Sequence, residues 1–132
     1  MNIRKLMLTA ALPLATMALP MAGSATQGSG YTTVVAVLTT SEANPAPATG
    51  LVYGGCMAYL ATPINQFSNS PNCPDRWVSF SCDGTYASKD AALMLLDQAQ
   101  LAQVAKKQVY VVVNDAKLHN GICTAFRVDL WN

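Results

Sequence analysis

The feature that most constrains the fold is one helical segment set among β-type segments. Residues 91–107 are rich in Ala, Leu, Gln and Met and contain neither Gly nor Pro, which predicts a helix. Ser88 can cap its N-terminus, and Lys106 and Lys107 at its end suit the helix dipole. Segments rich in β-branched and aromatic residues, predicted as strands, are residues 31–40, 51–62, 76–83, 108–114 and 122–131.

The order of these segments narrows the fold class. Three strands, one helix and two strands are the order of an OB-fold, a five-stranded barrel with its helix between the third and fourth strands. A ferredoxin-like domain needs a second helix, which the sequence does not predict. Residues 41–50 and 63–75 are expected as loops and residues 115–121 as a turn, with Asn120 and Gly121 as a hairpin signal.

The N-terminus has the pattern of a secretory signal peptide. Two cations precede residues 6–19, which carry no charge, and a Gly-Ser-Ala sequence ending at Ala25 supplies the small residues that signal peptidase accepts. The apolar run is about 14 residues, short of the roughly 20 that a membrane-spanning helix needs. We expect a signal peptide at residues 1–25, a single domain at residues 26–132, and secretion or periplasmic export without membrane insertion.

Net charge argues against nucleic acid as a partner. Once Arg4 and Lys5 leave with the signal peptide, six Lys and Arg remain against seven Asp and Glu, a formal net charge of −1. Nucleic-acid binding depends on clustered cations that neutralise phosphates. A slightly acidic chain is a poor match for that role.

The four cysteines predict two disulfides, because an even count in an exported domain indicates paired thiols. We expect the second and third strands to form a hairpin around residues 63–75, with Thr62 opposite Arg76. The same register sets Cys56 opposite Cys82, at a Cα separation that suits a disulfide.

This register also sets Ala58 opposite Phe80, which joins apolar faces of both strands. Cys73 and Cys123 then form the second bridge, with Cys123 on the outer face of the last strand, where a surface loop can reach it. With no C-x-x-C pair and a single histidine in the chain, no zinc site or other cofactor is expected.

Residues 95–114 (LLDQAQLAQVAKKQVYVVVN) resemble the B subunits of AB5 toxins of the subtilase-cytotoxin and typhoid-toxin type, in which an LLDQA-type helix leads into a V-x-V strand. The cysteines in GGCMAYL and WVSFSC resemble that group's intrachain bridge. The match covers residues 52–114 in order and spacing. It implies an OB-fold that assembles as a homopentamer with its helix facing the central pore, as a partner of a toxin A subunit or as a stand-alone secreted protein.

The resemblance also implies a shallow pocket near the first strand for sialylated or similar glycans. In that group the pocket uses a tyrosine-serine stretch, and the matching residues here are Tyr31, Thr32 and Thr33. Residues 42–49 and the second cysteine pair depart from the group's pattern. We therefore expect a glycan-binding module without enzymatic activity, with host or surface glycans as partners.

Aromatic and apolar side chains are also expected outside the core. The aromatic residues predicted to point away from the core faces are Tyr59, Trp77, Tyr110 and Trp131. The helix is apolar on more than one side, which favours oligomerisation. Its expected core stripe is Ala92, Leu95, Leu96, Ala99 and Ala102, and Met94, Leu101, Val104 and Ala105 extend the apolar surface.

Two other functions stay open. A secreted inhibitor or protein-interaction module would use the loop at residues 63–75, held rigid by Cys73. A small hydrolase would have to use His119, the only histidine, which the sequence places in a surface turn. No G-x-S-x-G motif supports the hydrolase.

Overall fold

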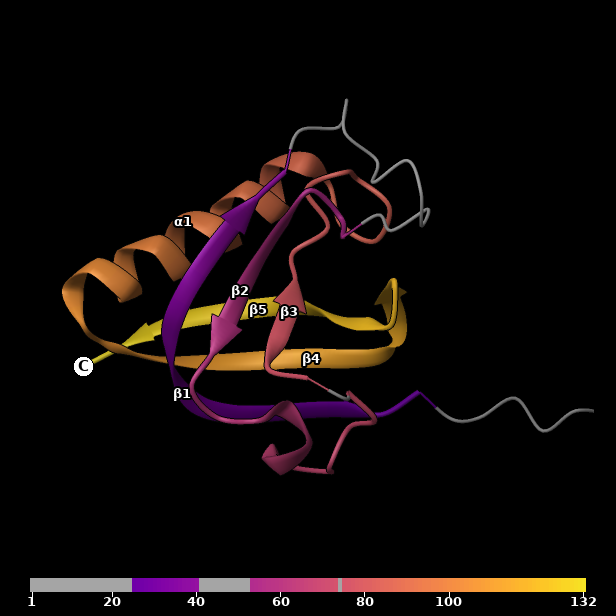
Figure 1. Ribbon diagram of the computed structural model, residues 1–132, viewed down its shortest axis with the longest axis horizontal. Helices are drawn as coiled ribbons and strands as arrows, with labels where there is room; N and C mark the ends of the chain where they lie inside the picture. The colour runs from indigo at the N-terminus through magenta and orange to yellow at the C-terminus, as the bar shows by residue number, and fades with distance from the viewer. Residues whose placement is uncertain (1–24, 41–52, 74) are drawn as a thin grey trace, which may run out of the picture.

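The computed structural model describes residues 25–40, 53–73 and 75–132. Its elements are β1 (Gln27–Thr39), β2 (Cys56–Leu60), the 3-10 turn η1 (Ile64–Gln66), β3 (Trp77–Ser79), α1 (Lys89–Ala105), β4 (Gln108–His119) and β5 (Ile122–Trp131) (Figure 1). Apart from Ala25, the expected signal peptide lies outside the described residues. So does the expected loop at residues 41–50.

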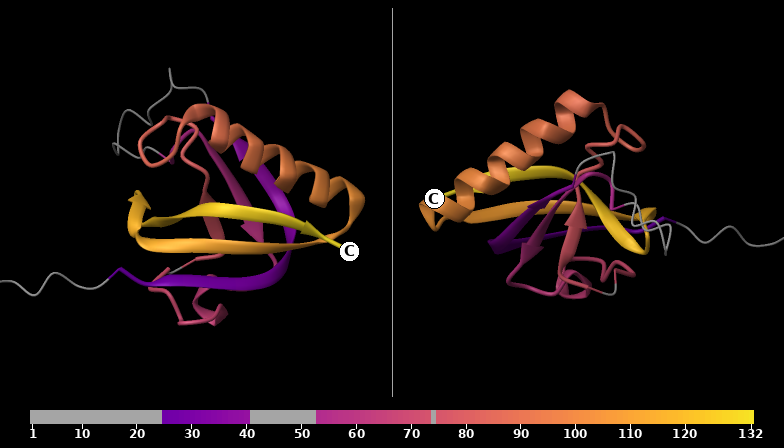
Figure 2. Two further views of the ribbon diagram at one scale, coloured as in Figure 1. Left: turned by 180° about the vertical axis from the view of Figure 1, so that it is seen from behind. Right: turned by 45° about the horizontal axis from the view of Figure 1, so that its top comes forward.

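The strands close into one barrel in the order β1-β2-β3-β5-β4. Neighbouring strands are antiparallel except for β3 and β5, which are parallel. Among the described residues, the single α-helix is α1, which connects β3 to β4 and packs mainly against β1 and β5 (Figure 2). These features confirm the predicted β-rich, OB-fold-like barrel with one helix and two disulfides.

β1 begins four residues before the predicted strand, since Gly28 and Gly30 also belong to the strand. The loop after β2 lies directly on their backbone. A Cβ at Gly30 would lie 2.5 Å from Phe67 Cδ1, and one at Gly28 would lie 2.5 Å from Pro71 Cδ. Glycine is therefore required here for close approach of the loop.

The predicted register of β2 and β3 is wrong by two residues. Ala58 pairs with Val78 and Met57 pairs with Ser79, so Phe80 is not opposite Ala58. A shift of two residues keeps the same side chains on the inner face, and Ala58 and Val78 are both fully buried. β2 itself begins at Cys56 because Gly54 and Gly55 adopt φ values of +71° and +80°.

The predicted Cys56–Cys82 bridge nevertheless forms, with Cα atoms 5.6 Å apart. β3 ends at Ser79, and Ser81 adopts a left-handed φ of 62°, which turns the chain back toward the start of β2. Two hydrogen bonds fix this turn: the Phe80 amide donates to the Cys56 carbonyl at 3.1 Å and the Asp83 amide donates to the Gly54 carbonyl at 3.0 Å.

The second predicted bridge, Cys73–Cys123, also forms, with Cα atoms 5.7 Å apart. Cys123 is fully buried rather than accessible on an outer face, because the loop ending at Cys73 covers it. The two residues are 50 positions apart, and closing a loop of that size stabilises a fold by about 4 kcal/mol in the chain-entropy account.

β4 runs on to His119, so the expected turn at residues 115–121 is wrong except for its last two residues. Asn120 and Gly121 form the hairpin turn, with φ values of 53° and 81°. The strand continues because its pairing shifts between Asn114 and Leu118. A shift of this kind, a β-bulge, absorbs extra residues without ending the strand.

A second irregularity places Phe126 on the surface, although alternation along the strand predicts it inside. Val113 pairs with Ala125 and Val112 pairs with Arg127, which leaves Phe126 unpaired. Its side chain is 44% exposed. The alternation of inward- and outward-facing residues along β5 therefore shifts by one residue at this bulge.

α1 confirms the predicted cap and most of the predicted core stripe. The Ser88 hydroxyl accepts a hydrogen bond from the Ala91 amide at 3.3 Å. The helix ends at Ala105, and Lys106 follows as its C-cap in the left-handed conformation. The buried helix residues are Ala92, Leu96, Ala99 and Ala102. Three small side chains among four allow the helix to lie close to the barrel.

Replacing Gly30 with Ala is expected to lower the free energy of unfolding by about 1–3 kcal/mol, because a methyl group there overlaps the Phe67 ring. Urea denaturation followed by tryptophan fluorescence measures this. Thr33→Ala, at an exposed position of the same strand, is the control and should change the value by less than about 0.5 kcal/mol. Equal stability of the two variants would contradict close packing of the loop on β1.

Candidate functional site

The structure separates the three residues expected to form the glycan pocket. Tyr31 and Thr33 are exposed on the outside of β1, whereas Thr32 is only 3% exposed. Thr32 Oγ1 accepts a hydrogen bond from the Thr62 amide at 3.0 Å, so this hydroxyl is already used within the fold. Tyr31 and Thr33 are the accessible part of the expected pocket.

Tyr31 belongs to a cluster of three rings on the outer face of β1, β4 and β5, which we call the aromatic surface (Tyr31, Tyr110 and Trp131). Tyr31 and Tyr110 pair across β1 and β4, with ring centroids 5.0 Å apart. The Trp131 ring meets Tyr31 edge-on at 5.4 Å. Tyr31 is 50% and Trp131 49% exposed, so strands hold two large rings half open to solvent.

An ion pair borders the aromatic surface. Arg127 Nε donates to the two carboxylate oxygens of Asp129 at 3.1 and 2.8 Å, and Arg127 Nη2 lies 2.7 Å from Asp129 Oδ2. The Asp129 hydrogen bond raises the pKa of Arg127. The guanidinium carbon lies 5.7 Å from the Tyr110 ring centroid, within cation–π range. Hydrogen-bond donors and acceptors thus stand next to the rings.

A second pair of rings, Tyr59 and Trp77, lies on β2 and β3. The two residues pair across the ladder, and their ring centroids are 5.0 Å apart. Both are half-buried, so less ring surface is accessible than on the aromatic surface.

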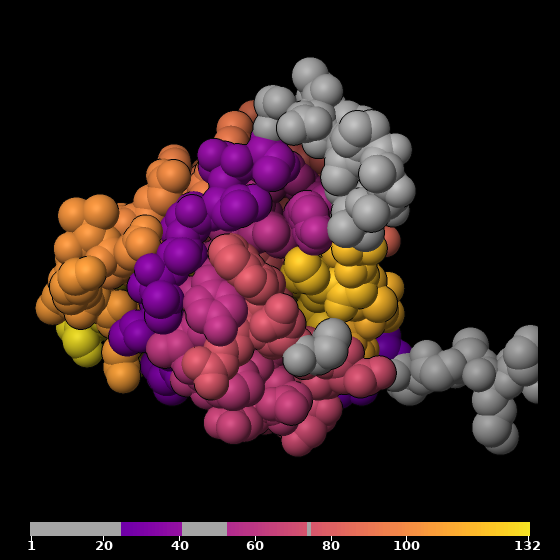
Figure 3. All heavy atoms as spheres, viewed as in Figure 1, coloured from indigo at the N-terminus to yellow at the C-terminus, as the bar shows by residue number. Residues whose placement is uncertain are grey.

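Figure 3 views one side of the barrel, where the indigo band of β1 separates α1 from β2.

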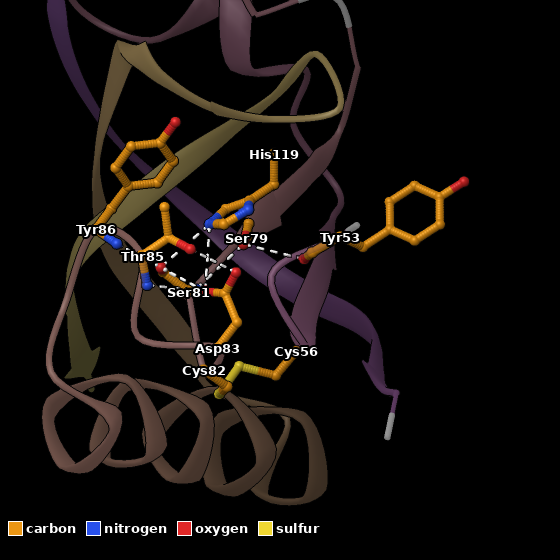
Figure 4. Close-up of a disulfide and its surroundings, with 9 residues drawn as sticks. All are labelled: Tyr53, Cys56, Ser79, Ser81, Cys82, Asp83, Thr85, Tyr86 and His119. Atoms are coloured by element: carbon orange, nitrogen blue, oxygen red, sulfur yellow. Dashed lines mark hydrogen bonds and ion pairs between the residues drawn. A yellow bond between two sulfur atoms is a disulfide. The ribbon is translucent and has the colours of Figure 1, made fainter. Parts of the chain in front are cut away.

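The structure also brings together a group that the sequence did not connect, which we call the polar cluster (Ser81, Asp83, Tyr86 and His119). His119 is 5% exposed at the end of β4, so its expected place in a surface turn is wrong. His119 Nε2 lies 3.1 Å from Ser81 Oγ and 3.7 Å from Asp83 Oδ1 (Figure 4). The Tyr86 ring packs edge-on against the imidazole, with centroids 4.8 Å apart.

Hydrogen bonds define the proton positions in the polar cluster. Ser81 Oγ donates to Asp83 Oδ1 at 3.0 Å and accepts from the Tyr86 amide at 2.8 Å. Because its one proton goes to Asp83, Ser81 Oγ can only accept from His119, which assigns the Nε2–H tautomer to the neutral imidazole. Burial lowers the pKa of His119, and the nearby Asp83 charge offsets this only in part.

Asp83 is held as a carboxylate. Burial alone would raise its pKa, but hydrogen bonds from Thr85 and Ser81 outweigh burial and lower the pKa overall. The Thr85 hydroxyl donates to Oδ2 at 2.7 Å and the Thr85 amide to Oδ1 at 3.1 Å. The negative charge is thus fixed on the side of the imidazole that carries Nε2.

This geometry differs from that of a Ser-His-Asp hydrolase. In a catalytic triad the serine gives its proton to Nε2 and the acid holds the opposite nitrogen, Nδ1. Here Ser81 donates to Asp83, and Asp83 lies beside Nε2. Ser81 is also 0% exposed, so its hydroxyl does not face a substrate. The polar cluster is arranged to hold the chain together.

One sequence signal for the polar cluster was Gly54. A Cβ at this residue would lie 2.8 Å from His119 Cδ2, so glycine makes room for the imidazole. The other signal was the pair Ser79 and Ser81, which alternate with apolar residues in the predicted third strand. Both serines are buried in the structure. The Ser79 hydroxyl donates to the Tyr53 carbonyl at 3.1 Å.

α1 presents an apolar face to solvent, opposite its buried stripe. Its large exposed side chains are Leu93 (48%), Met94 (69%), Leu101 (52%) and Val104 (81%). A shallow depression beside this face is lined by Met94, Leu95, Asp97 and Gln98 of α1 and by Val128 of β5. The helix is thus apolar on two sides, as the sequence predicts.

Among the described residues, no group of three or more His, Cys, Asp and Glu side chains is arranged to hold a metal ion. In the same part of the chain, no helix has the length and apolar character needed to cross a membrane. No family model, curated protein or solved structure matches the chain. The resemblance to toxin B subunits therefore stays a prediction from sequence.

Replacing Ser81 with Ala is expected to lower the free energy of unfolding by about 2–3 kcal/mol, because the Tyr86 amide and the His119 Nε2–H lose their buried acceptor. Thermal and urea denaturation measure this. Ser70→Ala, at an exposed serine that shares the left-handed φ of Ser81, should cost less than about 0.5 kcal/mol. If both variants are as stable as the wild type, the polar cluster does not hold the fold together.

Proposed function

We propose that the mature protein is a secreted or periplasmic OB-fold binding protein that recognises glycans through the aromatic surface, and that it is not an enzyme. The observation that carries this proposal is the pair of half-exposed rings, Tyr31 on β1 and Trp131 at the end of β5, whose centroids lie 5.4 Å apart. Two disulfides suit an oxidising compartment outside the cytoplasm, and the OB-fold is a scaffold on which oligosaccharide sites occur.

The chemistry around the rings supports a sugar as the ligand. A pyranose ring has apolar C–H faces that pack on flat aromatic surfaces, and its rim of hydroxyl groups needs donors and acceptors close by. Tyr31 and Trp131 supply the flat surfaces. Arg127 and Asp129 supply donors and acceptors beside Tyr110, and Arg127 is 60% exposed.

Trp131→Ala and Tyr31→Ala are each expected to weaken glycan binding by roughly 10- to 100-fold, as truncation of an aromatic anchor does. A glycan array identifies the ligand and titration calorimetry measures its affinity. Tyr53→Ala is the matched control, because the Tyr53 ring points away from the labelled residues around the Cys56–Cys82 bridge (Figure 4) and is not part of the aromatic surface.

Unchanged affinity in Trp131→Ala and Tyr31→Ala would show that the glycan binds elsewhere. If the wild-type protein bound no glycan at any valency, the proposal of glycan binding would be contradicted.

We further propose that the protein assembles as a homopentamer through the exposed apolar face of α1, as the resemblance to AB5 toxin B subunits implies. Large exposed apolar side chains that share one face mark an interaction surface, and Leu101 and Val104 are 52% and 81% exposed. Five copies would present five glycan sites together, and linked sites bind a surface with higher avidity than one site does.

Val104→Asp is expected to convert the pentamer to monomer, because it places a charge in the apolar contact. Native mass spectrometry gives the mass of the assembly directly. Asn65→Asp, which adds the same charge at an exposed position of η1, away from α1, should leave the pentamer intact. A wild-type protein that is monomeric at all concentrations would contradict the ring.

A second candidate function is a protein-interaction module without sugar binding. The observation that favours it is the loop between β2 and β3, which the Cys73–Cys123 bridge and the contact of Phe67 with Gly30 hold rigid. A toxin A subunit is the partner that the resemblance suggests. A neighbouring gene for a secreted protease or an ADP-ribosyltransferase-like subunit would support that partner.

A further inference from the structure

We propose that the polar cluster is an acid-sensitive latch, which holds the turn at residues 83–88 against β4 near neutral pH and releases it in mildly acidic solution. The proposal concerns the opposite end of β4 from Tyr110, and it does not depend on glycan binding.

Besides the hydrogen bond from the Asp83 amide to the Gly54 carbonyl, three contacts of Tyr86 hold the turn in place. The Tyr86 amide donates to Ser81 Oγ at 2.8 Å, and the Tyr86 hydroxyl donates to the Leu118 carbonyl at 3.1 Å. The Tyr86 ring also covers the imidazole of His119. The His119 imidazole therefore lies against Tyr86. A change in its protonation state acts on the contacts that Tyr86 makes.

The space around His119 is suited to a neutral imidazole. Its Nε2–H is satisfied by Ser81 Oγ at 3.1 Å, and Gly54 lies so close that a Cβ there would be 2.9 Å from Nε2. An imidazolium in the same place would carry a full charge in a site that is 5% exposed. Charges in such sites are costly unless an opposite charge contacts them.

Among the residues that the structure describes, Asp83 is the carboxylate placed to offset that charge, and it does so incompletely. It lies 3.7 Å from Nε2, beyond hydrogen-bond distance. Its oxygens already accept from the Ser81 hydroxyl and from the Thr85 amide and hydroxyl. Protonation of His119 therefore leaves a buried cation whose nearest anion is occupied by other partners.

The other titratable groups near the latch do not replace Asp83. On the strand that carries His119, Asp115 accepts hydrogen bonds from the Thr26 and Asn72 amides, and Lys117 is exposed. Lys89, beside Gly84 at the start of α1, is a cation. β3 and β5 contribute Ser79 and Ile122 next to the cluster, neither of which titrates.

The sign of the pH dependence follows from burial. Burial lowers the pKa of His119 in the folded protein, below its unfolded value of about 6.5. The closed latch is thus fully stable above pH of about 6.5, and it loses stability as the pH falls from there to the folded pKa, because the open form binds the proton more tightly. Acid opens the latch.

The Cys56–Cys82 bridge limits what opens. Cys82 stays joined to the start of β2, so the chain up to this residue keeps its place when the polar cluster is disrupted. The freed part is the turn that ends at Ser88, the cap of α1. The structure therefore predicts a local opening at the N-terminus of the helix rather than loss of the barrel.

Hydrogen exchange of the oxidised protein at several pH values tests this proposal. Protection factors of the Thr85 and Tyr86 amides are expected to fall by up to about tenfold per pH unit between about pH 6.5 and the folded pKa of His119. Amides in the ladder between β1 and β4 should keep theirs. Since the chain has a single histidine, its NMR ring signals titrate without ambiguity, and their midpoint should lie below about 6.5.

His119→Gln is the matched variant, because glutamine donates a hydrogen bond to Ser81 Oγ and takes up no proton. It should remove the pH dependence at Thr85 and Tyr86. A histidine midpoint at or above about 6.5, or protection at these amides that does not change with pH in the wild type, would overturn the latch. The wild-type measurements decide the matter even if His119→Gln does not fold.

Discussion

The bridge between Cys56 and Cys82 is the constraint on which much of this structure depends. It joins the first residue of β2 to the turn that follows β3, where the left-handed backbone of Ser81 reverses the chain. From that point the chain has to enter α1 close to the barrel. The same turn carries Ser81 and Asp83 to His119. A single covalent link thus places the start of the helix and the polar cluster together.

The Cys56–Cys82 pair was predicted from a register that is wrong by two residues, and the bridge forms because the chain turns at Ser81. The order of the strands along the chain and the helix could be predicted because each depends on a local pattern. The register of β2 and β3 could not, since pairing Ala58 with either Val78 or Phe80 keeps apolar side chains inward. The left-handed backbone of Ser81 decides between the two registers. A serine in the sequence does not predict that conformation. The early start of β1 was also missed, because Gly28 and Gly30 are explained only by the loop that packs on them.

The candidate site was predictable in part. Tyr31 was expected near a ligand and Trp131 was expected to point outward, but their meeting depends on how β1 and β4 close the barrel, a pairing between segments far apart in sequence. Thr32 faces inward for the same reason that Tyr31 faces outward, because neighbours on a strand alternate. His119 was misplaced because β4 passes through a bulge where its polar composition suggests a turn.

The measurement that tests this account most directly is disulfide mapping of the purified, oxidised protein under non-reducing conditions. Trypsin leaves Cys56 and Cys73 in one peptide, so chymotryptic cleavage, which follows residues such as Tyr59 and Phe67, is needed to separate them. The structure predicts one linked pair containing Cys56 and Cys82 and another containing Cys73 and Cys123. A peptide joining Cys56 to Cys73 or to Cys123 would contradict the barrel as described.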